Sequence, residues 1–261
     1  MSRPRARWRR VVGALVLMAG GCAEPLGVPS DAAGGLPADA PMQLYKPAGE
    51  GPFPAVVVLH GCGGIAERDR VWAARLNGWG YAALTVDSFG PRGVRQGLCT
   101  MPQLVPPNLR ARDAFAAAAW LRTLSEIDGA HIGVIGFSHG GWSVLKAISA
   151  SIVRSAGAVP FGAAVAYYPP CEPDLGGIAT DTLILIGESD DWVSAARCGD
   201  YAGSQAGQPR AVAIKRYPGA YHDFDVSAPE RWRYGHHLVY QAEAAEDAFA
   251  MTRQFFDARL K

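Results

Sequence analysis

Short apolar runs alternate with longer amphipathic stretches along most of the chain, and the two patterns predict different elements. The apolar runs predict strands at Gln43–Lys46, Pro54–His60, Tyr81–Val86, Ile132–Ile135, Ala163–Tyr168, Thr182–Ile186 and Arg210–Tyr217. The amphipathic stretches predict helices at Arg70–Asn77, Asn108–Leu124, Trp142–Ile148, Ala195–Ser204 and Val239–Leu260. Continuous β-branched runs are typical of parallel strands buried on both faces. The alternation predicts an α/β protein with a mostly parallel sheet and helices on both of its faces.

The stretch His131–Ile148 holds the strongest local motif, a GxSxG sequence between a predicted strand and a predicted helix. A serine on a sharp strand-to-helix turn exposes its hydroxyl, and glycines on either side let the two backbones approach closely. The N–H groups at the start of the following helix favour negative charge near that hydroxyl. We therefore predict that Ser138 is a nucleophile. The alternative is a plain glycine-rich turn.

Chemically useful residues follow several of the predicted strands. The turn His60–Gly64 follows the first buried strand, and Ser138 follows the central one. Asp190 follows a later strand and His222 the last. Because ligands bind outside the carboxyl ends of the strands in such sheets, we expect these residues to gather there. The order Ser, Asp, His is that of the α/β-hydrolase fold. Asp191 is the alternative acid, expected instead to cap the next turn or face solvent.

These side chains suit nucleophilic catalysis. A serine hydroxyl needs a base within hydrogen-bond reach, and a histidine with an unperturbed pKa of about 6.5 can take and return that proton. A buried carboxylate holds the imidazole in the required tautomer. Two backbone donors must face the developing alkoxide. We expect them at His139, directly after the nucleophile, and at Cys62 in the glycine turn, which His60 is expected to brace. The alternative for that turn is an ordinary strand-to-helix connection.

Five ordered motifs resemble the dienelactone hydrolase family of α/β-hydrolases. They are HGCGG after the first buried strand, DSFGPRG at 87–93, GFSHGG at 136–141, GESDDWV at 187–193 and PGAYHDF at 218–224. The resemblance covers about residues 42–258 and implies a hydrolase with a triad at Ser138, Asp190 and His222. The name-giving enzymes use a cysteine nucleophile. The serine in this chain favours a general carboxylic-ester hydrolase that needs no cofactor.

The first 22 residues resemble a bacterial export signal. Five arginines and no acid precede an apolar run too short to span a bilayer comfortably. Residues 19–22 resemble a lipobox in which alanine replaces the usual branched residue, and this would make Cys22 the lipidated start of an envelope-anchored lipoprotein. The alternative is cleavage near Ala23, which would release a periplasmic or secreted protein. We expect a flexible linker over 23–41 and one catalytic domain over 42–261.

Charge and cysteine content narrow the function classes further. Without residues 1–21 the chain has 20 basic and 24 acidic residues, a formal net charge of −4. This charge excludes the basic character that nucleic-acid-binding proteins need. Four cysteines remain beside Cys22, and in an oxidising compartment they allow two disulfides with three possible pairings. Cys171 and Cys198 follow neighbouring elements and are predicted to pair. Cys62 and Cys99 lie in two loops at the expected active face and are candidates for the other bridge. No cysteine or histidine spacing fits zinc, so we predict no metal site.

Several residues near strand ends are candidates for the walls of a substrate pocket. The aromatic ones, which are as consistent with core positions, are Trp142, Tyr168, Trp192 and Tyr221. Arg92 is a candidate for binding a substrate carboxylate, although a solvated arginine is the simpler interpretation. We predict a monomer that cleaves a small ester or lactone. The alternatives are a non-catalytic binding protein of the cell envelope and an esterase for polyesters or acetylated polysaccharides.

Overall fold

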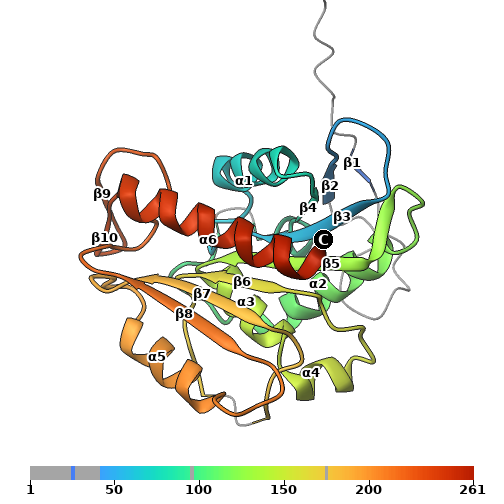
Figure 1. Ribbon diagram of the computed structural model, residues 1–261. Helices are drawn as coiled ribbons and strands as arrows, with labels where there is room; N and C mark the ends of the chain where they lie inside the picture. The colour runs from blue at the N-terminus through green and yellow to red at the C-terminus, as the bar shows by residue number, and fades with distance from the viewer. Residues whose placement is uncertain (1–24, 27–41, 95–96, 174–175) are drawn as a thin grey trace, which may run out of the picture.

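An eight-stranded sheet forms the centre of the protein, whose computed structural model describes residues 25–26, 42–94, 97–173 and 176–261 (Figure 1). The strands are β1 (Pro25–Leu26), β2 (Met42–Tyr45), β3 (Phe53–Leu59), β4 (Ala82–Val86), β5 (Ile127–Phe137), β6 (Ala164–Tyr167), β7 (Thr182–Gly187) and β8 (Val212–Tyr217). Their order is β1-β2-β4-β3-β5-β6-β7-β8. β1 and β2 are antiparallel to their neighbours, and the strands from β4 to β8 are parallel.

Helices cover both faces of the sheet. They are α1 (Glu67–Gly78), α2 (Pro107–Leu121), α3 (His139–Ala147), α4 (Ala150–Ser155), α5 (Ala195–Ser204) and α6 (Ala242–Leu260). A short 3-10 helix, η1 (Gly90–Arg92), follows β4. Figure 1 shows α1 and α6 on one face and the remaining α-helices on the other. The predicted α/β-hydrolase architecture, with a mostly parallel sheet between helical layers, is confirmed.

The core lies on both sides of the central strands. Residues 55–59 of β3 and all of β4 and β6 are buried, as their almost entirely apolar sequences predict. Burying each large aliphatic side chain there stabilises the fold by about 1.5–3 kcal/mol. Between the sheet and α6, Trp72 packs against the rings of Phe137, Tyr167 and Phe249. This packing fixes the carboxyl end of β5, where the motif serine follows.

Several elements differ from the predicted pattern, and β1, η1 and α4 were not predicted at all. β5 begins at Ile127, well before the predicted start at Ile132, because Phe53 pairs with Ile127 across a register shift. α6 begins at Ala242 and not at Val239. Between β8 and α6 an unpredicted hairpin forms from β9 (Arg231–Arg233) and β10 (His236–Leu238). Short strands made mostly of arginine and histidine residues leave no apolar pattern in a sequence.

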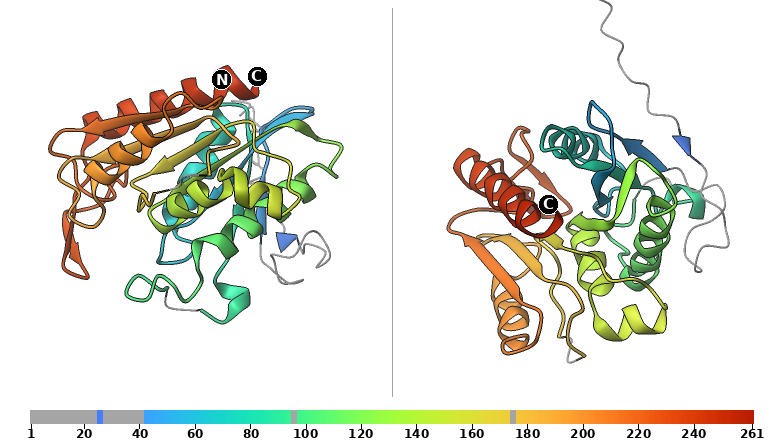
Figure 2. Two further views of the ribbon diagram at one scale, coloured as in Figure 1. Left: turned by 90° about the horizontal axis from the view of Figure 1, so that it is seen from below. Right: turned by 45° about the vertical axis from the view of Figure 1, so that its right-hand side comes forward.

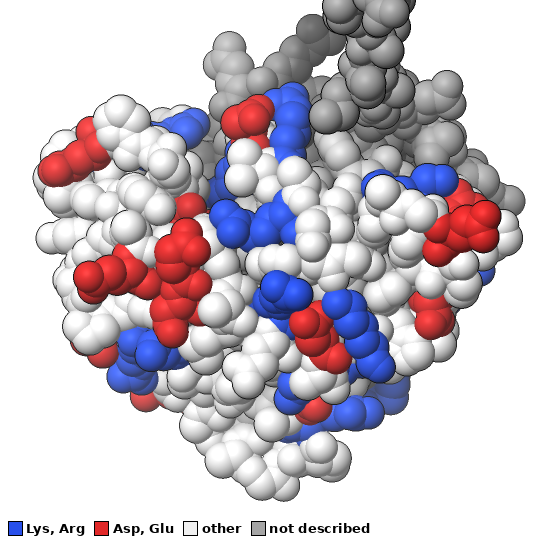
Figure 3. Space-filling model, turned by 45° about the horizontal axis from the view of Figure 1, so that its top comes forward, with Lys and Arg blue, Asp and Glu red and all other residues white. Residues whose placement is uncertain are grey.

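The hairpin and the loop before α2 project from the same side of the molecule (Figure 2). On the face shown in Figure 3, basic and acidic side chains of the described residues are interspersed. Within those residues, no helix combines the length and apolarity needed to cross a membrane. The predicted export signal, Cys22 and nearly all of the predicted linker lie outside the described residues.

Candidate active site

Ser138 lies at the sharp turn between β5 and α3. Its backbone has φ 54° and ψ −115°, a conformation that non-glycine residues rarely adopt. A Cβ atom on Gly136 would collide with the carbonyl oxygen of Gly140, and one on Gly140 would collide with that of Leu59. Close backbone contact therefore requires both glycines of the motif. The turn holds the serine hydroxyl at the end of the central strand.

His222 links Ser138 to Asp190 through two hydrogen bonds. His222 Nε2 lies 3.0 Å from Ser138 Oγ, and His222 Nδ1 lies 2.8 Å from Asp190 Oδ2. Because a carboxylate accepts, Nδ1–H donates to Asp190, and Nε2 accepts from the hydroxyl. Asp190 Oδ1 also accepts the backbone N–H groups of Trp192 and Val193, both at 2.9 Å. The ends of β5, β7 and β8 thus bring together the three predicted side chains.

Burial and a neighbouring carboxylate act in opposite directions on the His222 pKa. The side chains of His222 and Asp190 are 2% and 0% exposed. Burial lowers the pKa of His222, whereas the charge of Asp190 and the hydrogen bond to it raise it, and the outcome is a pKa above the ordinary 6.5. The imidazole therefore has the increased basicity that suits an acceptor of the serine proton.

Asp191 has a different set of partners. Its carboxylate oxygens accept the backbone N–H of His237 at 3.2 and 3.1 Å, and its carbonyl accepts from His236 Nδ1 at 3.0 Å. This acid thus fastens the β9–β10 hairpin to the loop after β7, a role that the sequence did not predict. Of the two adjacent acids, Asp190 is the one that contacts His222.

The two residues expected to donate backbone N–H groups lie beside Ser138. Cys62 and His139 both line the same cavity as the serine. His139 is the first residue of α3, so its N–H has no acceptor within the helix. Cys62 belongs to the turn after β3, where His60 Nδ1–H donates to the Gly61 carbonyl at 2.7 Å and braces the turn as predicted. The two turns meet at the serine.

Two disulfides close the walls of the site. Cys62–Cys99 ties the turn after β3 to the loop before α2, and Cys171–Cys198 ties the segment after β6 to α5. Both predicted pairings are confirmed. Disulfides form and persist in oxidising compartments, so this pair fits a protein that folds outside the cytoplasm.

Two cavities meet at Ser138. The first has a volume of about 380 Å³ and extends between the two disulfides past Pro102 and Pro170. The second has a volume of about 220 Å³ and lies beside His222 and the β9–β10 hairpin. Their shared wall consists of Cys62, Cys99, Ser138 and Trp192. A substrate held at the serine therefore has room on two sides.

The aromatic pocket candidates divide into cavity walls and core. Trp142 lines the first cavity, and Trp192 lines both. Tyr168 is fully buried: its ring centroid lies 4.5 Å from that of His222, and its hydroxyl donates to Asp225 Oδ1 at 2.6 Å. Tyr168 therefore supports the histidine ring from behind.

The other two pocket candidates contact protein groups. The ring of Tyr221 packs against that of His237, with 4.5 Å between centroids. Arg92 donates to both carboxylate oxygens of buried Asp113, at 2.8 and 2.7 Å. This ion pair joins η1 to α2 and is an alternative to a role for Arg92 at a substrate carboxylate.

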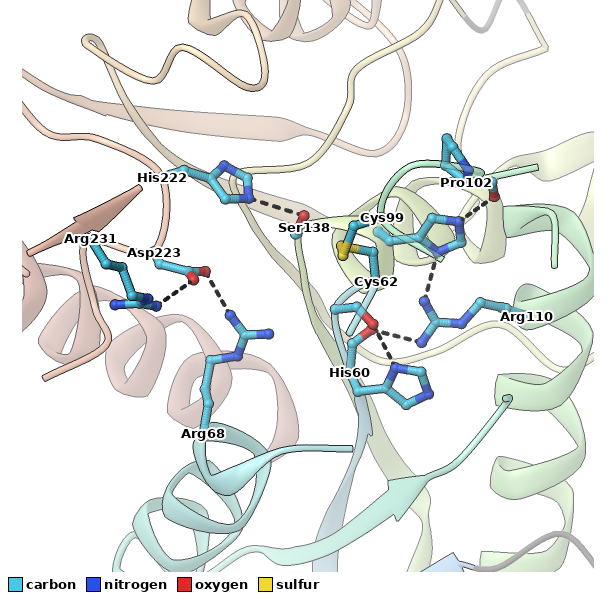
Figure 4. The surroundings of a disulfide bond; sticks show 12 residues. His60, Cys62, Arg68, Cys99, Pro102, Arg110, Ser138, His222, Asp223 and Arg231 are labelled. Atoms are coloured by element: carbon cyan, nitrogen blue, oxygen red, sulfur yellow. Dashed lines mark hydrogen bonds and ion pairs between the residues drawn. A yellow bond between two sulfur atoms is a disulfide. The ribbon is translucent and has the colours of Figure 1, made fainter. Parts of the chain in front are cut away.

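Three arginines that the sequence pattern did not single out line the second cavity: Arg68, Arg231 and Arg233. Arg68 and Arg231 donate to Asp223 at 2.8 and 3.1 Å (Figure 4). Burial alone would raise the pKa of Asp223, but the charges of Arg68, His222 and Arg231, together with the hydrogen bond from Arg68, hold the pKa below its usual range. The acids on this wall are Asp223 and Glu67. The second cavity therefore has a net positive wall.

The arginine cluster was missed because its members come from different elements. Arg68 precedes the predicted start of its helix, and residues 231–233 lie in a polar segment without an apolar pattern. The available signal was the Arg-x-Arg repeat shortly after the His222 motif. Within the described residues, no three His, Cys, Asp or Glu side chains are arranged to hold a metal ion.

Comparisons with known proteins agree with this architecture. A curated protein of Synechocystis sp., named "Putative carboxymethylenebutenolidase", is 25% identical over 84% of this chain and 91% of its own length. Two solved structures share the fold at 20% identity, and each comparison covers 92% of this chain and 99% of the other. They are a dienelactone hydrolase-like promiscuous phosphotriesterase from metagenomic libraries, with a TM-score of 0.73, and the dienelactone hydrolase of Anabaena variabilis, with a TM-score of 0.66.

The structure of an esterase shares the fold as well. Esterase 2 of Thermogutta terrifontis is 16% identical and has a TM-score of 0.65, and the alignment covers 90% of this chain. The family model described as "Dienelactone hydrolase family" matches residues 41–260, nearly the whole described domain. The chain therefore belongs to the dienelactone hydrolase family, a family of hydrolases with the α/β-hydrolase fold.

Proposed function

We propose that the protein hydrolyses a small carboxylic ester or lactone through an acyl-enzyme intermediate on Ser138. The observation that carries this proposal is the hydrogen-bonded series Ser138–His222–Asp190 at the junction of two cavities. Its order along the chain and its place at the ends of β5, β7 and β8 match the nucleophile, acid and base of a serine hydrolase.

Acylation begins when the ester carbonyl lies between Ser138 and the N–H groups of Cys62 and His139. His222 Nε2 takes the hydroxyl proton as Ser138 Oγ attacks the carbonyl carbon. The oxygen of the tetrahedral intermediate becomes negative and is stabilised by the two N–H groups. Asp190 stabilises the imidazolium, which then protonates the leaving alkoxide.

Deacylation repeats these steps with water. Water loses a proton to His222 Nε2 and attacks the acyl carbon, and the second tetrahedral intermediate collapses to release the acid. Ser138 regains its proton from the imidazolium. For a lactone, the leaving alcohol remains part of the acyl group, so a single hydroxy acid is the product.

The net positive wall of the second cavity narrows the substrate class. Arg68, Arg231 and Arg233 lie within the cavity that opens on one side of Ser138. A negatively charged substituent such as a carboxylate gains charge-assisted hydrogen bonds there. The larger first cavity accommodates the uncharged part of the molecule. We expect small esters with one acidic group to be preferred over neutral ones.

Export belongs to the same proposal. A basic and then apolar start of the chain and two disulfides support folding outside the cytoplasm. The cysteine that ends the Ala-Gly-Gly-Cys motif supports a lipid-anchored form. Mass spectrometry of the protein from its native envelope tests this: a diacylglyceryl group on Cys22, lost in Cys22→Ala, is expected, whereas an unmodified terminus near Ala23 contradicts anchoring.

A fluorophosphonate probe tests the catalytic proposal directly, because such probes react with activated serines. The wild-type protein is expected to be labelled at Ser138, and Ser138→Ala and His222→Ala are expected to lose labelling. A panel of short esters and lactones, each with and without a carboxylate, then identifies the substrate class. Absence of labelling and of ester hydrolysis in folded wild-type protein would favour a non-catalytic binding protein.

A further inference from the structure

Arg110 of α2 is a fully buried cation beside the two turns that flank Ser138 (Figure 4). Burial lowers its pKa to about 10, which still leaves the guanidinium charged at neutral pH. No carboxylate among the described residues forms an ion pair with it, and Asp113, on the same helix, pairs with Arg92. Removing a charge from water without a paired acid is costly. The groups that Arg110 does contact are therefore informative.

The Arg110 guanidinium donates to both turns at once. One amino group donates to the His60 carbonyl at 2.8 Å, and the other donates to His139 Nδ1 at 2.7 Å. His60 precedes Cys62 by two residues in the turn after β3, and His139 follows Ser138 directly. The two residues that offer backbone N–H groups to the substrate thus belong to turns held by a single planar group with fixed donor geometry.

The hydrogen bond from Arg110 also fixes the state of the His139 ring. Because arginine only donates, Nδ1 accepts, and Nε2–H donates to the Pro102 carbonyl at 2.8 Å. Burial and then the Arg110 charge lower the pKa of His139 to about 4, so the imidazole is neutral at neutral pH. The ring thereby connects the start of α3 to the loop that carries Cys99.

Phe89 completes the support around Arg110. The Arg110 Cζ atom lies 4.9 Å from the centre of the Phe89 ring. The same ring lies edge-on to the rings of His60 and His139, with centroid distances of 4.4 and 6.1 Å. Both histidines and the arginine are therefore fixed in orientation by one buried aromatic side chain as well as by hydrogen bonds.

We propose that Arg110 is a positioning residue for the oxyanion site. Its guanidinium holds the N–H groups of Cys62 and His139 at the separation that the reacting oxygen needs. This inference rests on the proposed ester hydrolysis. The two donors come from different strand ends, and a donor is effective only within about 2.7–3.1 Å of the oxyanion. The positive charge of Arg110, held close to both turns, also favours the negative intermediate.

Steady-state kinetics of Arg110→Met and Arg110→Lys on one short ester test this role. Arg110→Met is expected to lower kcat about 100-fold, because a displacement of about 1 Å at a reacting centre costs that much. KM is expected to change little, since the donors act on the intermediate and not on the ground state. The affinity for a boronic acid that forms a tetrahedral adduct with Ser138 is expected to fall in parallel with kcat. Arg110→Lys is expected to show an intermediate loss, because an ammonium group lacks the planar fork.

The matched control is Arg122→Met at the other end of the same helix. Arg122 also donates to a backbone carbonyl, that of Gly129, at 3.2 Å. Its removal is expected to leave kcat unchanged. A second test combines Arg110→Met with His139→Ala, which removes the ring and keeps the backbone N–H. If the arginine acts through that ring, the kcat of the double variant is expected to be little lower than that of the less active single variant.

The outcomes are distinct. Unchanged kcat in a folded Arg110 variant, a rise in KM with constant kcat, or an equal loss in Arg122→Met overturns the inference. If Arg110→Met does not fold, the kcat of Arg110→Lys and of His139→Ala decides by the same criteria. Wild-type protein that is neither labelled by a fluorophosphonate nor active on esters overturns the proposed function itself. Active wild-type protein with active Arg110 variants overturns the positioning role alone.

Discussion

The two cavities that meet at Ser138 are built from different interactions. Beyond the shared wall, which contains the Cys62–Cys99 disulfide, the first is lined by Cys171 of the second disulfide and by apolar side chains such as Trp142. The second is enclosed by arginines held in place through ion pairs with Asp223. Covalent closure fixes the shape of one side, and charge defines the other. Under the proposed function, we expect substrate size and substrate charge to be selected on opposite sides of Ser138.

The largest expected effect comes from the residue that both cavities share. Ser138→Ala removes the proposed nucleophile, and we expect kcat to fall about 10⁶-fold on every ester, charged or neutral. Ester hydrolysis measured with a chromogenic leaving group checks this, with circular dichroism as the control for folding. A variant that kept a substantial rate on either class would show that one cavity has a nucleophile of its own.

Asp190→Asn is expected to lower kcat about 10⁴-fold, again on both substrate classes, because the imidazole loses its orientation. The pH profile adds a second readout. His222 must be neutral to accept a proton, so activity of the wild type rises with pH through a His222 pKa above 6.5. Without the carboxylate this pKa falls, and the acidic limb moves to lower pH. A limb that did not move would contradict the assignment of Asp190.

Arg231→Gln separates the two cavities. We expect about a tenfold loss of kcat/KM on an ester that carries a carboxylate, the value of one charge-assisted hydrogen bond, and little change on the uncharged ester of the same size. The ratio of the two rates is the measurement. Arg154→Gln, at an exposed position on α4, serves as the control. Equal losses of kcat/KM on both esters would mean that the second cavity does not distinguish charged from uncharged substrates.

The smallest effect on rate is expected from the disulfides, and the two should differ. Loss of either bond is expected to lower the free energy of unfolding by about 2–4 kcal/mol. Cys99→Ser should also lower kcat, because Cys62 carries a proposed N–H donor, whereas Cys198→Ser should leave kcat on the smallest esters unchanged. Denaturant unfolding and kinetics on the same samples check both statements. A larger loss of kcat in Cys198→Ser than in Cys99→Ser would contradict the greater importance of the Cys62–Cys99 disulfide for the reaction.

The parts of the site that follow strands could be predicted from the sequence. Ser138 comes directly after a predicted strand, and Asp190 and His222 lie within a few residues of the ends of two others. Parallel strands deliver their carboxyl ends to one edge. The disulfide pairing followed from the same reasoning, since Cys62 and Cys99 both belong to loops at that edge. The pattern of apolar runs and their order along the chain were enough to predict these residues, because a parallel sheet places the loops after its strands next to one another.

Residues whose roles depend on tertiary contact could not be predicted. Arg110 lies inside an alanine-rich amphipathic helix, where an arginine ordinarily faces solvent, and here it is buried against His60, Phe89 and His139. Arg231 lies in a hairpin whose strands are polar. Arg92 is the opposite case. Its place in a long loop made it a candidate for a substrate contact, and in the structure it forms an ion pair with Asp113 of α2. Charged side chains reveal their partners only after the helices are packed.

The placement of groups around Ser138 also has a consequence for chirality. In Figure 4, His222 lies on one side of the serine, and Cys62 lies on the other. A carbonyl oxygen directed towards Cys62 and His139 presents only one of its two faces to the hydroxyl. The substituents of a stereocentre next to that carbonyl then meet unlike groups of the protein, because the walls on the two sides of Ser138 differ. Mirror-image esters exchange those substituents, so we expect the protein to resolve a racemic mixture and release one enantiomer of the acid first.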